Sequence, residues 1–511
     1  MNFTPIGRLL LRSRGRRVDR WRGRGAEIQE SQLRRLLKRA KDTDFGRAHD
    51  FEGILRSADI RKAYAEHVPA ASYEDFRQDV MRMADGEADV LWPGVCRNFA
   101  QSSGTSGGRS KFIPVTRDSL RLNHYPGSAD VVAQYLRAFP ESRLLSGKAF
   151  ILGGSFESRL RPKGRGVKVG DLSATLIDSM PGPSAWLRVP DKKTALLADW
   201  NVKLDALARA SVGCDITNIS GVPSWFLRVI RHALDISGKE KASDLWPNLE
   251  VFFHGGISFE PYREEYEKLT DPEKMHFFET YNASEGFFAT QSGRVNDGLL
   301  LLIDNGIYYE FLPLDAPYGT PTLGVGELRQ GEVYEMIISA CNGLWRYRIG
   351  DTVKVVAADP LKIRVAGRTK SFINAFGEEL MESNAEEAVT AACRATGAEI
   401  VNYTAGPLYA SEGRKGRHQW VFEFSVVPDD ARKFLGVLDA TLKKSNSDYA
   451  AKRSGDLFLD PPQVFSVPEG TFDAWLSGQG SGKLGGQRKI PRLRNDRTIL
   501  DALLPRAIPE E

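Results

Sequence analysis

Residues 249–286 read LEVFFHGGISFEPYREEYEKLTDPEKMHFFETYNASEG, and the order of patterns in this stretch decides the fold class. Residues 249–253 and 276–278 are short apolar runs of strand character, and residues 262–269 between them have a helical pattern. A strand, a helix and a second strand in succession are typical of an α/β layer fold. The stretch therefore predicts an α/β protein.

The same alternation extends upstream, whereas the chain downstream of Tyr281 is richer in strand patterns. Upstream, strand runs lie at 96–101 and 149–152, and helical stretches lie at 26–43, near 60, at 192–210 and at 224–233. Downstream, residues 299–314 read as a hairpin around Asp304-Asn305-Gly306, and strand runs follow at 332–340 and 352–356. We therefore predict a large N-terminal α/β domain with a β-rich portion, spanning residues 1–367.

A second, smaller domain is predicted after Gly367-Arg368. Its patterns are helices at 383–396 and 429–445 and strands at 400–409, 418–427 and 463–467. This order is typical of an α+β domain rather than of an α/β layer. We place it at residues 368–511, with the boundary in the stretch 366–371.

Composition and charge exclude several classes of protein. Of the 511 residues, 41% are hydrophobic and 27% are charged, which is typical of a globular protein and not of a disordered or collagen-like one. The formal net charge of +4 is small for this length, so we expect no nucleic-acid partner. No stretch reaches the ~18 successive apolar residues of a membrane-spanning helix.

The cysteines and the N-terminal arginines are informative about the cellular location of the protein and about contact with a membrane or a partner. Cys96, Cys214, Cys341 and Cys393 form no C-x-x-C pair, which favours neither a disulfide framework nor a zinc site and fits a cytoplasmic location. Residues 8–24 are rich in arginine. They are either a solvated basic helix or a segment that touches an anionic membrane or a partner.

A loop rich in glycine and hydroxyl groups is the first candidate site. Ser102-Ser103-Gly104-Thr105-Ser106 and the glycines after them offer backbone and hydroxyl donors, and Lys111 closes the loop. These groups suit a polyphosphate, although a flexible turn would have the same composition. The loop is not a Walker motif, because no Gly-Lys-Ser/Thr follows.

The same loop also satisfies the G-x-S-x-G pattern of a hydrolase nucleophile elbow, at Gly104–Gly108 with Ser106 in the centre. An elbow requires a helix directly after the serine. Residues 109–115 are extended in character and contain Pro114. A serine hydrolase is therefore the weaker interpretation.

Two acidic motifs are the further candidates. Tyr281-Asn282-Ala283-Ser284-Glu285-Gly286 places a hydroxyl beside a carboxylate where a strand ends, and Glu285 could hold Mg²⁺ against a phosphate. In Tyr347-Arg348-Ile349-Gly350-Asp351, the aspartate at a glycine turn could accept both hydroxyls of a ribose. Each could equally be an ordinary solvated acid in a turn.

Taken together and in this order, the motifs resemble those of the adenylate-forming superfamily. Within it, the chain is similar to the Gretchen Hagen family of acyl-acid amido synthetases, as a bacterial-type member. Gly367-Arg368-Thr369-Lys370 resembles the superfamily's hinge, and Gln487-Arg488-Lys489-Ile490-Pro491-Arg492 resembles the family's late lysine motif. The resemblance runs from about residue 90 to the C-terminus.

The resemblance implies a mobile C-terminal domain and an ATP site between the two domains. It assigns the ATP phosphates to Ser102, Ser103, Gly104, Thr105, Ser106 and Lys111. It assigns phosphate and Mg²⁺ to Ser284 and Glu285, whose motif also contains Tyr281 as a cofactor-binding residue. It assigns the ribose to Asp351 and a further cofactor-binding role to Arg368 at the hinge. Lys489 would steady the adenylation transition state. Pocket candidates for the acid are residues 220–226 and 255–258, and aromatic candidates are Trp186, Trp225 and Phe226.

The activity implied has two steps. A carboxylic acid attacks the α-phosphorus of Mg·ATP to give an acyl-adenylate and pyrophosphate, and an amine then displaces AMP. Plant members carry Asp-Lys-Thr after the hinge, where this chain has Phe376-Gly377-Glu378-Glu379-Leu380, and Gln-Tyr-Lys where it has Gln-Arg-Lys. Coenzyme A or another thiol or alcohol therefore stays open as the acceptor. A non-catalytic nucleotide-binding protein is the third hypothesis.

Overall fold

The computed structural model describes the chain except residues 1, 103–110, 159, 181, 183–185, 257–258, 314–315, 317–318, 369–371, 411–414, 455–458, 479–490 and 510–511. The chain divides into two compact units. The N-terminal unit holds the described residues of 1–102 and 111–369, and the C-terminal unit holds those of 370–511.

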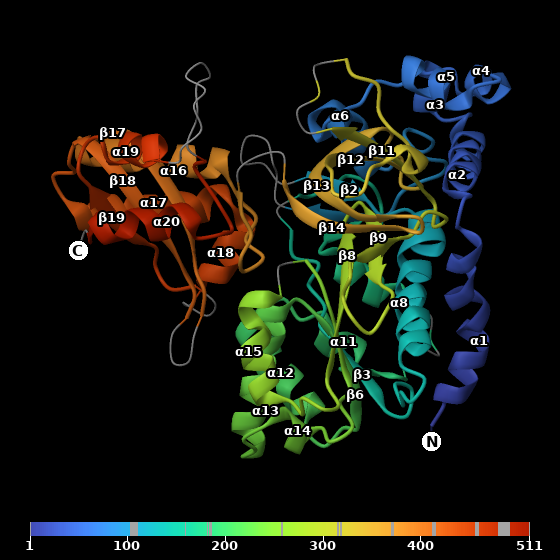
Figure 1. The fold of residues 1–511 in the computed structure, drawn as a ribbon, viewed down its shortest axis with the longest axis horizontal. Helices are drawn as coiled ribbons and strands as arrows, with labels where there is room; N and C mark the ends of the chain where they lie inside the picture. The colour runs from blue at the N-terminus through green and yellow to red at the C-terminus, as the bar shows by residue number, and fades with distance from the viewer. Residues whose placement is uncertain are drawn as a thin grey trace. The chain divides into compact units, whose positions relative to one another are not determined.

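One mixed sheet organises the N-terminal unit (Figure 1). Among the described residues it has eleven strands in the order β11-β12-β13-β14-β10-β9-β8-β7-β6-β3-β5. Its parallel half comprises β5 (Arg188–Val189), β3 (Lys148–Ile151), β6 (Ile216–Gly221), β7 (Val251–His254) and β8 (His276–Ala283). Its antiparallel half comprises β9 (Gly286–Gln291), β10 (Leu299–Leu301), β14 (Leu361–Arg368), β13 (Tyr347–Ala358), β12 (Val333–Ala340) and β11 (Ile307–Pro313). The predicted α/β class and its β-rich portion are confirmed.

Helices connect the parallel strands, as the alternating pattern predicts. Helices α13 (Pro223–Ser237) and α14 (Ala242–Leu245) link β6 to β7, and α15 (Glu260–Leu269) links β7 to β8. The single helix predicted at 192–210 is wrong: α11 (Lys192–Ala195) and α12 (Trp200–Ser211) are separate helices. The second begins afresh because Asp199 Oδ1 accepts a 2.9 Å hydrogen bond from the Val202 amide, which caps its N-terminus.

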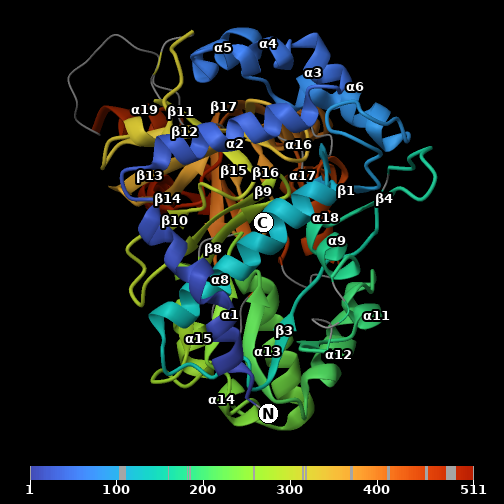
Figure 2. The ribbon, with the colours of Figure 1, turned by 90° about the vertical axis from the view of Figure 1, so that its right-hand side faces the viewer.

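The N-terminal helices lie against the antiparallel half and the long helix α8 (Tyr125–Ala138) (Figure 2). The predicted helices at 26–43 and near 60 are confirmed as α2 (Gly25–Ala40) and α5 (Ile60–His67). Gln29 of α2 donates to the carbonyls of Ile303 and Ile307 and accepts from the Tyr309 amide, which ties α2 to β11. The remaining helices before β3 are α1 (Thr4–Arg16), η1 (Arg17–Arg20), α3 (Asp44–Ala48), α4 (Phe51–Arg56), α6 (Tyr73–Ala84), α7 (Arg117–Ser119), η2 (Leu120–His124) and α8 (Tyr125–Ala138).

A small second sheet of the N-terminal unit carries the loop predicted to bind phosphate. Its order is β2 (Lys111–Pro114), β1 (Asn98–Ser102), β4 (Lys168–Gly170), with β1 antiparallel to β2. Helix α9 (Leu172–Asp178) follows β4, and η3 (Val325–Glu327) lies between β11 and β12. The strand predicted at 96–101 is confirmed as β1, and the extended character after the loop is confirmed as β2.

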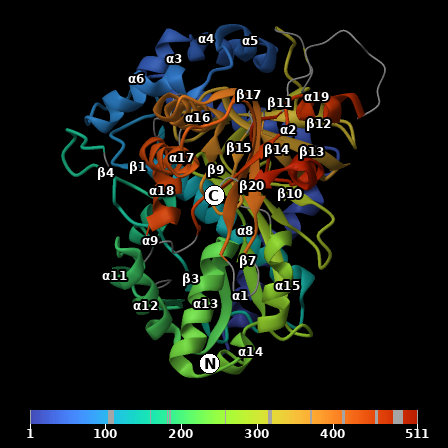
Figure 3. The same cartoon turned by 90° about the vertical axis from the view of Figure 1, so that its left-hand side faces the viewer.

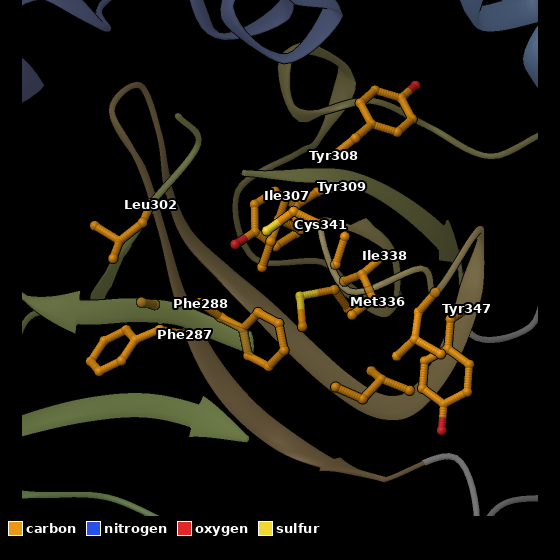
Figure 4. Packing of buried hydrophobic residues seen from close by; sticks show 14 of the residues in the cluster. Phe287, Phe288, Leu302, Ile307, Tyr308, Tyr309, Met336, Ile338, Cys341 and Tyr347 are labelled. Atoms are coloured by element: carbon orange, nitrogen blue, oxygen red, sulfur yellow. The ribbon is translucent and has the colours of Figure 1, made fainter. Parts of the chain in front are cut away.

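The hairpin predicted at 299–314 is wrong. Strand β10 pairs with β9 and β14, whereas β11 pairs with β12, so the two strands on either side of Gly306 are not partners. Burial explains the difference, because Leu299–Leu301 and Ile307 are almost inaccessible and each strand joins a different part of the core. Figure 4 shows that core, with Phe288, Tyr309 and Met336 packed between the strands.

The C-terminal unit is an α+β domain (Figure 3). Its four-stranded sheet has the order β17 (Glu399–Leu408), β18 (Arg417–Val426), β19 (Gln463–Val467), β20 (Ile508–Pro509). Phe422 packs on Phe434 of α17 (Ala431–Ser445) with ring centroids 5.3 Å apart, and Val421 on the other face of the sheet packs with Phe472 and Leu500. The other elements are β15 (Phe372–Ile373), β16 (Leu380–Met381), α16 (Glu382–Thr396), α17 (Ala431–Ser445), α18 (Ser447–Arg453), α19 (Thr471–Gly478), α20 (Thr498–Leu503) and η5 (Leu504–Arg506).

The secondary structure predicted for this C-terminal segment is confirmed at every element named from the sequence. No helix in the described part of the chain is both long enough and apolar enough to span a bilayer.

Candidate active site

The turn between β8 and β9 holds the first acidic motif. Tyr281 lies in β8 opposite Ala289, and Ser284 and Glu285 form the turn itself. Gly286 restarts the strand where a Cβ would lie 2.7 Å from Ile307 Cδ1, so only glycine fits without displacing the core. Glu285 is only 7% exposed, and its carbonyl accepts a 3.1 Å hydrogen bond from Asn342 Nδ2. It is therefore not the solvated surface acid of the alternative interpretation.

The second acidic motif lies within strand β13. The expected glycine turn is wrong, because residues 347–351 are all strand residues. The ladder between β12 and β13 is irregular here, and Gly350 has a φ of +88°, which is typical of a bulge. Asp351 is 6% exposed. A solvated turn aspartate is thereby excluded.

These two motifs meet through one short hydrogen bond. The hydroxyl of Tyr281 donates to Asp351 Oδ2 at 2.5 Å, across 70 residues of sequence. A bond of this length to a carboxylate is a strong, charge-assisted one. It fixes the orientation of the Asp351 carboxylate next to the turn that carries Glu285.

Lys111, the first residue after the loop, contacts the same strand β13 at Tyr347. Its Nζ donates to the hydroxyl of Tyr347 at 3.1 Å and lies 5.9 Å and 5.7 Å from the ring centroids of Tyr73 and Tyr347. The side chain is 5% exposed. The two rings thus surround a buried ammonium group, a favourable arrangement of a cation with aromatic rings.

The charge of Glu285 influences one of these two aromatic residues, Tyr73. Burial raises the pKa of Tyr73, and the carboxylates of Glu74 and Glu285 raise it further, against a hydrogen bond with Phe112 and the charge of Arg77. Tyr73 also faces the ammonium of Lys111, 5.9 Å from its ring centroid. Lys111, Glu285 and Asp351 all belong to the N-terminal unit.

Some predicted site residues can be placed only by their backbone. Ser102 is the last residue of β1 and pairs with Lys111, and Arg368 is the last residue of β14 and pairs with Asp351. Ser103, Gly104, Thr105 and Ser106 lie outside the described residues, as does Lys489. The elbow serine of the hydrolase interpretation is among them, and the next described residues, Lys111–Pro114, form strand β2.

Sequence reasoning missed the residues that hold β13 in place. Arg346, with a φ of +42°, forms a buried ion pair with Glu310 at 3.0 Å and donates to the carbonyls of Ala65 and Val68. Its amide donates to Ser339 Oγ at 2.9 Å. The pair is almost fully buried and thus fixes the strand just before Tyr347. Its partners are distant in sequence, so no local pattern could identify it.

The two stretches predicted to line an acid pocket lie at one edge of the sheet. Gly221 ends β6, His254 ends β7, and the two residues are paired, so residues 220–226 and 255–256 follow neighbouring parallel strands. The carboxyl edge of parallel strands is where α/β proteins bind ligands. Ile257 and Ser258 lie outside the described residues.

The aromatic candidates differ in their surroundings. Phe226 is a core residue, fully buried, with its ring centroid 5.0 Å from that of Phe150. Trp186 is 84% exposed, and Trp225 is partly buried. Of the three, only Trp225 has the partial burial expected of a pocket wall at this edge.

Comparison with known proteins gives one consistent result. Residues 16–192 match the GH3 family N-terminal domain, residues 300–368 the GH3 family central domain, and residues 383–498 the GH3 family C-terminal domain. The chain is 23% identical to a probable indole-3-acetic acid-amido synthetase GH3.1 of Arabidopsis thaliana, over 94% of the chain and 91% of the relative. A relative of the same name from Oryza sativa subsp. japonica is 24% identical, over 93% and 88%.

Two solved structures share the fold. One is the AtGH3.15 acyl acid amido synthetase in complex with 2,4-DB, with a TM-score of 0.59 and 20% identity, covering 96% of this chain and 95% of that one. The other is a 2-hydroxyisobutyryl-CoA ligase in complex with 2-HIB-AMP and CoA, with a TM-score of 0.54 and 14% identity, covering 94% and 92%. The adenylate-forming architecture expected from the motifs is confirmed.

Proposed function

The chain belongs to the GH3 family, and from that premise we propose that it is an ATP-dependent acyl-acid amido synthetase. It is an AMP-forming ligase that joins a carboxylic acid to an amino acid or another amine. The observation that supports the proposal is that strand β13 takes part in both buried contacts, through Tyr347 with Lys111 and through Asp351 with Tyr281. Small-molecule acids and amines are its partners.

The first step of the reaction activates the carboxylate of the substrate, which is a poor electrophile. A carboxylate repels nucleophiles, so one of its oxygens first attacks the α-phosphorus of ATP, the bond to the β-phosphate oxygen breaks, and pyrophosphate leaves. The neutral amine then attacks the acyl carbon of the adenylate, AMP leaves with the electrons of the acyl–oxygen bond, and the amine loses a proton. Catalysis of the first step is mostly electrostatic, because negative charge spreads over the phosphoryl oxygens.

The described residues have separate roles in ATP binding. Asp351 accepts hydrogen bonds from the ribose hydroxyls, and Tyr281 holds its carboxylate in position. Lys111 places a positive charge near the phosphates, where the surrounding rings exclude water and strengthen its field. Ser284 supplies a hydroxyl donor from the turn.

The remaining roles fall on segments that lie largely outside the described residues. The loop Ser102–Ser106 supplies donors to the phosphates, and Lys489 steadies the transition state. A hinge at 366–371 that includes Arg368 lets the domain of residues 368–511 serve both steps. The division of the chain into compact units at residues 369 and 370 supports that hinge.

The residues fit Mg²⁺ as a companion of ATP rather than as a permanent metal. No group of three or more His, Cys, Asp or Glu side chains that could hold a metal occurs among the described residues. Mg²⁺ is commonly held by one or two carboxylates together with substrate phosphates, so the buried Glu285 suffices. The ion would supply neutralisation of phosphate charge.

Two observations support more specific proposals about the cellular location, the type of family member and the acceptor. The four cysteines are free, which supports a reducing cytoplasm as the place of work. The stretch Phe376–Leu380 lacks the lysine of plant members, which supports a bacterial-type member and keeps a thiol or alcohol acceptor, such as coenzyme A, as the second candidate function.

One assay tests the function and the acceptor together. The protein is incubated with Mg·ATP and panels of aryl, indole and aliphatic carboxylic acids, and the adenylate is trapped with hydroxylamine as a hydroxamate. Amino acids and coenzyme A are then offered separately to the responsive acid. An amide product is expected. A thioester would assign the second candidate, and no hydroxamate with any acid would favour a non-catalytic nucleotide-binding protein.

A further inference from the structure

Helix α1 presents an apolar face to solvent at the edge of the N-terminal unit. Its inner face lies against α8 (Figures 1 and 2), where a Cβ at Gly15 would be 3.2 Å from the carbonyl oxygen of Ala133. On the outer face, Ile6, Leu9 and Leu10 are 58%, 70% and 73% exposed. Leu9 and Leu10 are three and four residues after Ile6, so the three side chains share one side of the helix.

This exposure is costly, and the fold gives no reason for it. Three neighbouring large aliphatic side chains in water lose the burial that would stabilise each by roughly 1.5–3 kcal/mol. Phe3, just before the helix, adds a fourth apolar side chain that is partly exposed. Contiguous exposed apolar groups on a protein surface mark an interaction site.

A dense positive charge accompanies the apolar face. Residues 1–24 contain eight arginines and one aspartate, a net charge of +7, whereas the whole chain carries only +4. Arg14 and Arg17 bind Asp130 at 2.8 and 2.5 Å and so attach the helix to α8. The charge on this segment therefore contrasts with the net −3 of the rest of the chain.

Half of these arginines are available to a partner. Arg12, Arg16, Arg20 and Arg22 are exposed, and none forms an ion pair with a described residue. Arg12 and Arg16 continue the row that begins at Leu9, at intervals of three and four residues. Arg12 and Arg16 thus lie beside the apolar side chains of α1, and Arg20 and Arg22 follow the end of the helix.

We propose that this face of α1 docks the protein on an anionic lipid bilayer. Ile6, Leu9 and Leu10 insert at the boundary between headgroups and acyl chains, and the exposed arginines contact lipid phosphates. The combination selects this partner: a nucleic acid would pair with the arginines but leave the aliphatic side chains in water. The proposal is independent of the proposed enzymatic function.

The test is sedimentation of the full-length protein with lipid vesicles. Vesicles of phosphatidylcholine mixed with phosphatidylglycerol are expected to bind the protein in a salt-sensitive way, and vesicles of phosphatidylcholine alone to bind it weakly. The double variant Leu9→Asp/Leu10→Asp is expected to bind at least about tenfold more weakly. Its matched control, Val295→Asp/Val427→Asp, changes two valines of similar exposure elsewhere and should bind as the unmodified protein does.

A second variant tests the charge separately. Arg12→Gln/Arg16→Gln/Arg20→Gln is expected to weaken binding to anionic vesicles by about fivefold for each arginine removed. Lys193→Gln/Lys239→Gln/Arg329→Gln removes three exposed charges elsewhere and is the control. Thermal melting checks the fold of each variant, and if the leucine variant fails to fold, the arginine variant decides.

Three results would overturn the proposal. One is equal binding to anionic and neutral vesicles, and another is undiminished binding by both the leucine variant and the arginine variant. The third is absence of vesicle binding together with α1-dependent binding to duplex DNA or to polyglutamate, which would assign the face to a nucleic acid or an acidic protein instead.

Discussion

The hydroxyl of Tyr281 donates a 2.5 Å hydrogen bond to Asp351 Oδ2, so a residue of β8 fixes the carboxylate of a residue of β13. The two strands are not neighbours in the sheet, since β9, β10 and β14 lie between them. Both side chains are almost fully buried. The bond therefore links the turn that carries Glu285 to the strand that carries Tyr347, the partner of Lys111.

Removal of this bond should weaken ATP binding. Tyr281→Phe leaves Asp351 with a carboxylate that can rotate, so we expect KM for ATP to rise by about tenfold, equivalent to about 1.5 kcal/mol. Steady-state kinetics of adenylate formation measure the change. Tyr309→Phe is the matched control, because the buried Tyr309 hydroxyl has no hydrogen-bond partner among the described residues. Equal effects of the two substitutions would contradict the role given to Tyr281.

The charge of Lys111 should serve catalysis rather than stability. Lys111→Met preserves the volume between Tyr73 and Tyr347 but removes the ammonium. We expect the rate of acid-dependent pyrophosphate exchange to fall by on the order of a hundredfold, as for loss of one oxyanion donor. The free energy of unfolding, measured in urea, should fall little or rise, because a buried cation is costly. A destabilised variant with normal exchange would make Lys111 a structural residue.

Much of the fold could be predicted from local pattern, and the errors have a common cause. Strands such as β19 and helices such as α16 follow from period and length alone. The hairpin at Gly306 failed because β10 and β11 find partners far away in sequence, and the turn signal says nothing about pairing. The break before α12 had a local signal, Asp199 as a capping residue, that the periodicity of 192–210 concealed.

The candidate active site, too, could be predicted only in part from local sequence patterns. The motifs that contain Glu285 and Asp351 could be singled out from the sequence, but each alone was compatible with a solvated acid. Their burial depends on tertiary packing, as does the position of Tyr73, which lies at the start of α6 with no local sign of contact with Lys111. Only the arrangement in space distinguishes these residues from ordinary turn residues.

A buried lysine outside the site should govern the stability of the N-terminal unit at alkaline pH. Burial lowers the pKa of Lys203 from 10.5 to about 8, and its Nζ donates to the carbonyl of Gly154 at 3.0 Å. Below about pH 8 the lysine is charged in both the folded and the unfolded protein, and the cost of burying this charge lowers the free energy of unfolding. Between about pH 8 and about pH 10.5 only the unfolded chain keeps the proton, so stability rises with pH.

The contribution of Lys203 is measured by comparing the free energy of unfolding of Lys203→Met with that of the unmodified protein across this pH range. Lys203→Met should be more stable than the unmodified protein near pH 8, and the advantage should shrink as the pH approaches about 10.5. Lys193→Met, at an exposed lysine nearby, should parallel the unmodified protein at every pH. A constant offset for Lys203→Met across this range would show that Lys203 does not titrate in the native state.

Glu378, in the stretch 376–380 that lacks the lysine of plant members, should stabilise the core of the C-terminal unit. Glu378 is fully buried, pairs with His418 Nε2 at 2.8 Å and accepts from the Phe376 amide at 2.7 Å. Glu378→Gln should lower the free energy of unfolding of this unit by about 3 kcal/mol. Glu387→Gln, on the exposed side of α16, should change it little. Lost amide formation with unchanged stability would instead place Glu378 in acceptor binding.

The most direct test of the account follows one oxygen atom. The responsive acid, labelled with ¹⁸O in its carboxylate, is converted to the amide in unlabelled water, and the products are analysed by mass spectrometry. Attack of the carboxylate on the α-phosphorus predicts one ¹⁸O in AMP and none in pyrophosphate. Label in inorganic phosphate, or AMP without label, would contradict activation of the acid as an acyl-adenylate.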